Sequence, residues 1–91
     1  MNERQEKQLE KNLKSVANRR RLLILNFLKK KKEAGVGEIA ENIKLSFKAT
    51  SKHLGILSMT DILEKEQRGL QIFYRITPNQ PEPIKSILEL L

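Results

Sequence analysis

The amino-acid sequence predicts a small, mainly α-helical domain of the α+β class, for three reasons. Segments with helical periodicity cover most of the chain. Residues 62–67 and 70–76 instead have the character of strands, because apolar side chains alternate along the second segment; Arg68 and Gly69 lie between them as the predicted turn of a β-hairpin. The chain has 91 residues, the length of one domain, so residues 1–91 are predicted to fold as a single unit.

Two helices are predicted before residue 32. Residues 3–17 are rich in Glu, Lys, Gln and Leu, which are good helix formers, and they carry a sparse apolar stripe. A stripe this narrow packs against one neighbour, which is either the rest of its own domain or a second subunit. Asn18 is a suitable N-cap for a second helix over residues 19–31. That helix is apolar on most sides, so it is expected to be the central helix of the core.

Two further helices are expected at residues 38–43 and 47–59, with Ser46 as the N-cap of the second. At about 100° per residue, Phe47 and Leu54 fall on the apolar side of this second helix. The opposite side has no carboxylate and presents small and basic residues, namely Lys48, Ser51, Lys52 and Gly55. Such a surface suits a helix that lies against phosphates and base edges in the major groove of DNA.

The order of these elements predicts a winged helix-turn-helix. Residues 38–59 form the helix-turn-helix, in which the second helix is the recognition helix. The two-stranded β-hairpin over residues 62–76 follows as the wing. Three prolines then lead into a short amphipathic helix within residues 81–91, which carries a second narrow apolar stripe.

Composition restricts the classes of function. Lys and Arg number 18 against 11 Asp and Glu, which gives a net charge of +7 and indicates a polyanionic partner, with a solvated basic surface as the alternative. The absence of cysteine excludes disulfides, thiolate metal sites and a cysteine nucleophile. One histidine and no recognisable pair of carboxylates predict a protein that is not an enzyme and has no cofactor. The chain shows neither a long apolar segment nor a signal-peptide pattern, so no membrane partner is expected.

Three segments resemble motifs of the arsenic-repressor (ArsR/SmtB) family of bacterial and archaeal transcriptional regulators. Residues 16–25, VANRRRLLIL, are similar to the family's opening L-A-x-P-x-R-L-x-I-L. Residues 45–54, LSFKATSKHL, are similar to L-S-x-x-x-x-S-x-H-L, which is the most specific of the three. Residues 69–76, GLQIFYRI, resemble the end of the family's wing, G-x-x-x-Y-Y-R-L. The resemblance extends over residues 13–77.

The resemblance implies a homodimer, built from the first and last helices, on an operator with inverted-repeat symmetry. The two recognition helices would enter successive major grooves about 34 Å apart. Binding normally represses transcription in this family, and in many members a metal ion releases the DNA. Gly35 and Gly37 stand where metal-sensing members carry a cysteine pair, and the final helix has no histidine. The chain is therefore predicted to lack the usual metal sites, and its sequence identifies no effector.

The predicted DNA contacts follow from side-chain chemistry. Lysines can meet phosphates or guanine O6 and N7, and a serine hydroxyl can bond to a phosphate or a base edge. Gly55 would let the backbone approach the duplex. Arg68 at the wing tip would reach the minor groove. An exposed turn arginine that contacts no DNA is an equal alternative for Arg68. His53 is expected to pack or hydrogen-bond rather than to bind a metal. The full predicted set is Lys48, Ser51, Lys52, Ser46, Gly55, Arg68 and Arg20.

The apolar stripes of the two terminal segments, residues 1–17 and 81–91, predict the dimer interface. A domain this small has too little surface to cover both stripes itself. The residues expected in the interface are Leu9, Leu13, Val16, Ile84, Ile87, Leu88 and Leu91.

These observations predict a dimeric, sequence-specific regulator that binds double-stranded DNA, most readily as a repressor, at the nucleoid in the cytoplasm of a bacterium or archaeon. Two alternatives stay open. A winged-helix module that binds an acidic protein would show no salt-dependent affinity for duplex DNA. A chromosome-organising protein would bind DNA with a steep salt dependence and little sequence preference.

Overall fold

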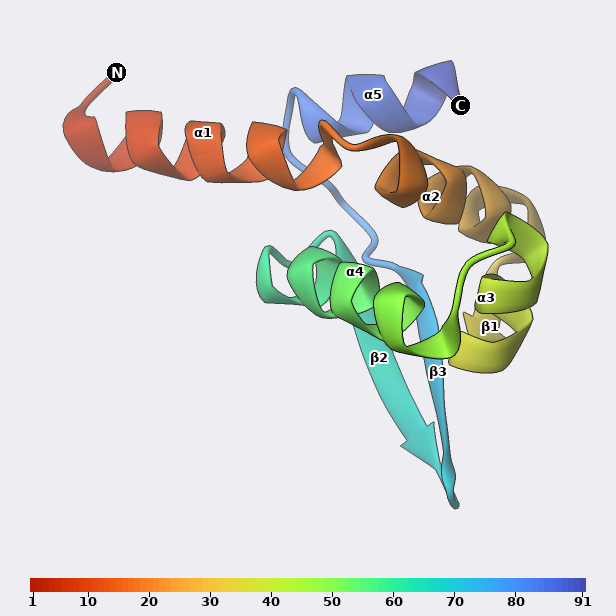
Figure 1. The fold of residues 1–91 in the computed structure, drawn as a ribbon. Coiled ribbons are helices and arrows are strands. Elements are labelled where there is room, and N and C mark those ends of the chain that lie inside the picture. Colours follow the sequence, from red (N-terminus) through yellow and green to blue (C-terminus); the bar gives the residue numbers. More distant parts are fainter.

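The computed structural model describes residues 1–91 as five helices and a three-stranded antiparallel sheet (Figure 1). The predicted winged helix-turn-helix is confirmed, and no helix is long and apolar enough to cross a membrane. In chain order the elements are α1 (Glu3–Val16), α2 (Arg19–Lys31), β1 (Glu33–Gly35), α3 (Val36–Ile43), α4 (Phe47–Met59), β2 (Leu63–Arg68), β3 (Gln71–Ile76) and α5 (Ile84–Leu90).

Side-chain caps fix where the two central helices begin. The Asn18 side chain accepts hydrogen bonds from the backbone N–H groups of Arg20 and Arg21, at 3.0 and 3.2 Å. The Ser46 hydroxyl accepts one from the N–H of Ala49 at 3.1 Å. Both caps were predicted, and each contributes about 1 kcal/mol by satisfying donors that the helix leaves unpaired. The first residues of α2 and α4 are therefore determined locally.

The core forms around α2, as its apolar surface predicted. Ile24, Leu25 and Leu28 of this helix are almost completely buried. Leu54 and Leu57 of α4 are fully buried against them, together with residues from α3 and the sheet. One continuous cluster thus connects the helices to the sheet, which fixes the orientation of α4.

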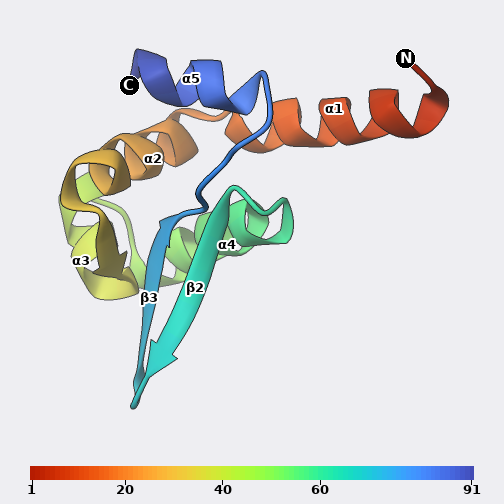
Figure 2. The ribbon, with the colours of Figure 1, turned by 180° about the vertical axis from the view of Figure 1, so that it is seen from behind.

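The two terminal helices and the wing lie at opposite ends of the molecule. α1 and α5 lie together at one end, and the β2–β3 hairpin projects from the other (Figures 1 and 2). α4 lies in front of the hairpin in Figure 1 and behind it in Figure 2, so it packs along one face of the sheet. The wing is therefore distant from α1 and α5, and α4 lies between, in contact with the sheet and with the C-terminal end of α1.

The sheet differs from the predicted two-stranded hairpin in one respect. A third strand, β1, pairs with β3, so that Glu33 lies opposite Arg75 and the strand order is β1-β3-β2. This strand is only three residues long, too short for alternation to reveal it. It places the Glu33 carboxylate beside the wing, within reach of Arg68.

The wing turn is displaced by one residue from its predicted position. Arg68 pairs with Gln71 as the last rung of the hairpin, so the two-residue loop is Gly69-Leu70 rather than Arg68-Gly69. Gly69 has φ of +64°, as the first position of a tight hairpin turn requires. Arg68 is consequently a strand residue, and its side chain projects from the same face of the sheet as that of Glu66.

Candidate nucleic-acid interface

The exposed face of α4 carries cations that have no partner. Lys48 and Lys52 are exposed and form no ion pair, while Ser51 beside them is half-buried. Gly55 is exposed on the same face, and a Cβ built on it would meet nothing within 4 Å. α4 contains no acidic residue. This surface is therefore unobstructed and positively charged, as a helix that meets a phosphate backbone requires.

Two other predicted contacts lie at the N-terminal ends of helices. Ser46 is exposed, and its oxygen is already the acceptor in the cap of α4, which leaves the hydroxyl proton free to donate. Arg20 is half-buried in the first turn of α2, and its charge contributes to lowering the pKa of His53 on α4. Arg20 thus lies close enough to the recognition helix to add to its positive potential.

Phe47 is not on the buried face of α4, where its helical position had placed it. Its side chain is 63% exposed. Phe47 lines an open hollow between the start of α3 and the wing, together with Leu70 and Ile72 of the hairpin. As the first residue of α4, it lies at the edge of the packed layer, where no core element covers it. The sequence did not predict that Phe47 is exposed. Its position directly after the Ser46 cap, at the very start of the helix, was the signal that could have indicated this exposure.

His53 has a structural role, as predicted. Its Nδ1 accepts a hydrogen bond of 3.2 Å from the Arg21 Nε, and Arg21 also donates to the backbone oxygens of Lys14 and Ser15, at 3.3 and 3.1 Å. Burial, followed by the charges of Arg21 and Arg20, lowers the pKa of His53, which favours the neutral imidazole that can accept this hydrogen bond. Arg21 and His53 therefore hold α1, α2 and α4 together.

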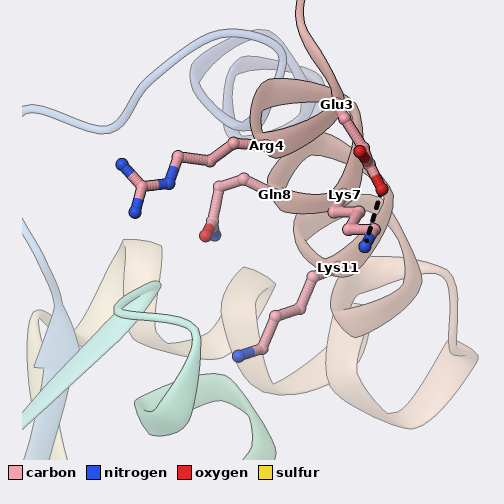
Figure 3. Close-up of a pocket in the computed structure, with 5 residues that line it drawn as sticks. All are labelled: Glu3, Arg4, Lys7, Gln8 and Lys11. Atoms are coloured by element: carbon pink, nitrogen blue, oxygen red, sulfur yellow. Dashed lines mark ion pairs between the residues drawn. The ribbon is translucent and has the colours of Figure 1, made fainter.

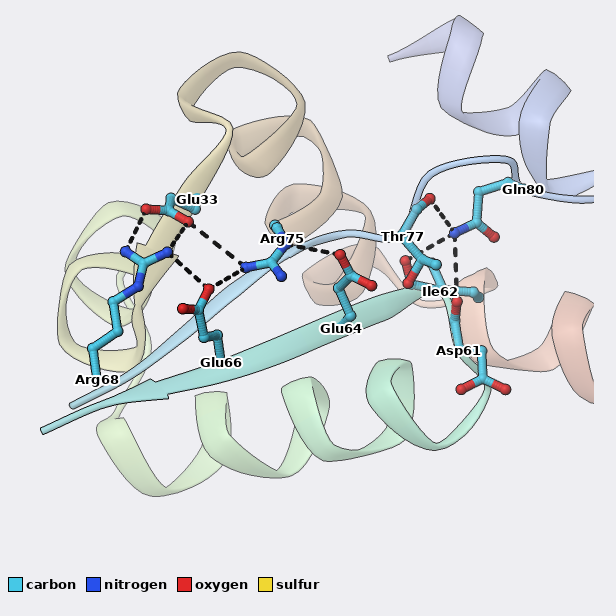
Figure 4. Close-up of polar contacts among 9 residues, drawn as sticks. All are labelled: Glu33, Asp61, Ile62, Glu64, Glu66, Arg68, Arg75, Thr77 and Gln80. Carbon is cyan, nitrogen blue, oxygen red and sulfur yellow. Dashed lines mark hydrogen bonds and ion pairs between the residues drawn. The ribbon is translucent and has the colours of Figure 1, made fainter. Parts of the chain in front are cut away.

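Arg68 does not extend from the wing tip. Its guanidinium donates two hydrogen bonds to Glu33, at 2.7 and 2.9 Å, and one of 3.0 Å to Glu66 (Figure 4). It also lies 4.7 Å from the centre of the Phe73 ring, a cation–π contact. The predicted position of Arg68 at the wing tip is therefore corrected: the third strand supplies Glu33, which draws the guanidinium back onto the sheet.

Arg75 completes a group of charged side chains on the sheet, here called the wing cluster, which consists of Glu33, Glu64, Glu66, Arg68 and Arg75. It donates to Glu64 at 2.8 Å and to Glu66 at 2.9 Å (Figure 4). Hydrogen bonds from Arg68 and then Arg75 lower the pKa of Glu66 to about 2. A hydrogen bond from Arg68 is likewise the main cause of the lowered pKa of Glu33. The wing cluster links β1 to both strands of the wing. Its carboxylates neutralise the positive charges of Arg68 and Arg75.

The wing cluster predicts a loss of stability in acid. Because the pKa of Glu66 is lower in the folded protein than in the unfolded chain, its stabilisation is complete above its ordinary pKa of 4.5 and disappears as the pH falls towards 2. Urea unfolding of the wild type and Glu66→Gln should therefore differ at pH 6, and the difference should shrink below pH 4.5 and largely disappear as the pH reaches 2. Glu41→Gln, which alters an exposed carboxylate outside any ion pair, should show no such convergence. A constant difference between wild type and Glu66→Gln across this range would contradict the assignment.

The terminal helices expose only part of the apolar surface predicted for the dimer interface. Val16 and Ile84 are buried in the core, and this corrects their placement in the interface. Val16 lies where α1 meets α2, and Ile84 begins α5 against the domain. Leu13 is 39% exposed and Leu90, which the sequence prediction omitted, is 85% exposed. The half-buried positions among those predicted are Leu9, Ile87, Leu88 and Leu91.

The first half of α1 is polar on the sides that Figure 3 displays. Arg4, Gln8 and Lys11 extend on one side of the helix, and Lys7 pairs with Glu3 at 3.0 Å on another. This half of α1 projects beyond the rest of the domain, as Figure 1 shows. At the other end, Lys29 of α2 donates to the backbone oxygen of Leu88 at 2.9 Å, which fastens α5 to the core. α5 is therefore held by its own domain, whereas most of α1 is not.

Comparison with known proteins identifies the class of regulator. The family described as "Bacterial regulatory protein, arsR family" matches residues 18–65, just over half of the chain. The transcriptional activator HlyU of Vibrio cholerae is 34% identical over 79 residues, which cover 87% of this chain and 69% of HlyU. The transcriptional repressor PagR of Bacillus anthracis is 35% identical over 79 residues, covering 87% of this chain and 76% of PagR.

Solved structures agree with the sequence comparison. HlyU from Vibrio cholerae has a TM-score of 0.81 at 30% identity, with 98% of this chain and 92% of HlyU covered. A homodimeric winged helix-turn-helix DNA-binding domain from Mycobacterium bovis, Mb0332, has a TM-score of 0.80 at 27% identity, with 99% of this chain and 82% of that domain covered. The similarity extends through the winged helix to both terminal helices. The chain therefore belongs to the arsR family of bacterial regulatory proteins.

Proposed function

We propose that this regulator is a dimeric repressor that binds an inverted-repeat operator through α4. The observation that supports this most directly is the exposed face of α4, where Lys48 and Lys52 have no partner and no carboxylate intervenes. A dimer bound over a promoter represses by occupancy alone. Among its relatives, PagR is described as a repressor and HlyU as an activator, so the direction of control requires a direct test. Such a function places the protein at the nucleoid.

In the proposed complex, α4 enters the major groove with its N-terminal turn closest to the base edges. Phosphates would be met by lysines and by helix N-terminal groups. Arg68 is left out, because Glu33 and Glu66 already satisfy its guanidinium. The residues proposed to contact DNA are Lys48, Ser51, Lys52, Ser46, Gly55 and Arg20.

The proposed dimer forms at the end opposite the wing, where α1 and α5 lie together (Figure 1). Leu9 and Leu13 of α1 and Leu90 of α5 offer apolar surface there that the protomer leaves uncovered or half-covered. Burying such surface between two protomers stabilises the dimer by roughly 25 cal/mol for each Å². The Mycobacterium bovis relative is described as homodimeric, which supports the same arrangement here.

Selection of binding sites from a random duplex library, at two salt concentrations, tests this function. Enrichment of an inverted repeat, with half-sites about one helical turn apart, would support a dimeric sequence-specific regulator. Binding without enrichment that is lost steeply with salt would favour the chromosome-organising alternative. Absence of binding at both salt concentrations would contradict DNA binding and favour an acidic protein partner. Transcription from a promoter that carries the selected site, with and without the protein, then distinguishes repression from activation.

A further inference from the structure

Phe47 is a large apolar side chain whose exposure the fold does not explain. It is 63% exposed at the first position of α4 and contributes nothing to the core cluster. Leu70, fully exposed at the wing tip, and Ile72 lie on the other side of the same open hollow. Three apolar side chains thus surround a hollow between the recognition helix and the wing. An exposed apolar group of this kind points to a binding partner.

The position of Phe47 favours DNA as that partner. In helix-turn-helix proteins the N-terminal residues of the recognition helix contact base edges. Phe47 precedes Lys48 directly and lies one helical turn before Ser51, so a duplex that meets these two residues also meets the phenyl ring. Lys44, exposed at the end of α3, adds a further cation nearby in the chain. A second protein that covered Phe47 would have to approach the same basic surface.

The charge around the hollow is consistent with this partner. Glu38 is the one carboxylate that lines it, and it is paired with Lys31 at 3.4 Å. The phosphates of an approaching duplex therefore meet cations on α4 and only a neutralised carboxylate beside Phe47. An acidic peptide would suit the lysines but would not need a phenyl ring at the first position of the helix.

The chemistry of the ring specifies what it can recognise. A phenyl group neither donates nor accepts a conventional hydrogen bond, so it cannot distinguish bases by their polar edges. The apolar group that base pairs present in the major groove is the C5-methyl of thymine, and phenylalanine is among the side chains that contact it. We propose that Phe47 is a specificity-determining residue that selects thymine in each half-site by contact with its methyl group. This inference rests on the proposed function.

Replacing thymine by deoxyuridine tests the contact, because it removes the methyl group and keeps the base pair. On the operator obtained by selection, each thymine of a half-site is replaced in turn and Kd is measured. Wild-type protein should lose about fourfold in affinity at one position, the expected contribution of one buried methyl group. Phe47→Ala should bind more weakly than wild type and should not distinguish thymine from deoxyuridine there. Met59→Ala, which removes an exposed apolar side chain from the other end of α4, should keep the fourfold preference.

A second variant changes the specificity rather than removing it. Glutamine can make two hydrogen bonds to adenine, so binding-site selection with Phe47→Gln should replace the preferred thymine by adenine at the same position. Equal affinity of the wild type for thymine and deoxyuridine at every position would overturn the inference while leaving the proposed function intact. Absence of any DNA binding by the wild type would overturn both. Circular dichroism of each variant checks that the fold is unchanged.

Discussion

Lys48→Ala combined with Lys52→Ala is expected to weaken operator binding by about a hundredfold for each half-site without unfolding the protein. Each lysine is exposed and unpaired, so its replacement removes no contact from the fold. A hydrogen bond to a charged group contributes about 1.5 kcal/mol or more, which corresponds to about tenfold in affinity for each lysine. A dimer loses four such contacts, so the slope of log K against log salt should become less steep by about four.

Fluorescence anisotropy at several salt concentrations measures both quantities, and thermal unfolding verifies the fold. Lys7→Ala combined with Lys11→Ala is the matched control, because it removes the same charge from α1, at the end of the molecule opposite the wing. The control should bind nearly as tightly as the wild type. If the two double variants lose affinity equally, net charge rather than α4 is responsible. Unchanged affinity of the α4 variant would refute its assignment as the recognition helix.

Leu13→Glu is expected to convert the dimer into a monomer at micromolar concentration. Leu13 is 39% exposed near the C-terminal end of α1, so a glutamate is solvated in the protomer but would be buried without a partner in the dimer. Sedimentation velocity should show a protomer of 10.6 kDa in place of the dimer. The variant should also lose its preference for two half-sites over one, because each recognition helix then binds alone.

Leu70→Glu makes the same chemical change at a fully exposed leucine on the wing, far from α1 and α5, and should leave the sedimentation coefficient unchanged. A wild-type protein that sediments as a monomer at micromolar concentration would contradict the proposed interface. So would a Leu13→Glu variant that stays dimeric.

The sequence alone determined the elements and their ends wherever the signal was local. Asn18 and Ser46 were recognisable as N-caps because a capping side chain bonds to N–H groups only two or three residues away. The periodicity of α2 indicated its burial, and the absence of carboxylates from α4 indicated its basic face. These properties depend on residues within one or two helical turns, so no tertiary information was needed.

Only the tertiary structure decided how side chains from distant parts of the chain are used. Arg68 meets Glu33 across 35 residues, a pairing that depends on a strand too short to recognise in the sequence. Phe47 is exposed, and Val16 and Ile84 are buried, although all three continue apolar stripes. Periodicity identifies the apolar side of a helix, but burial depends on where the neighbouring elements end. The packing of the whole chain sets where the neighbouring elements end. It therefore determines which apolar side chains stay exposed and can contact DNA or a second protomer.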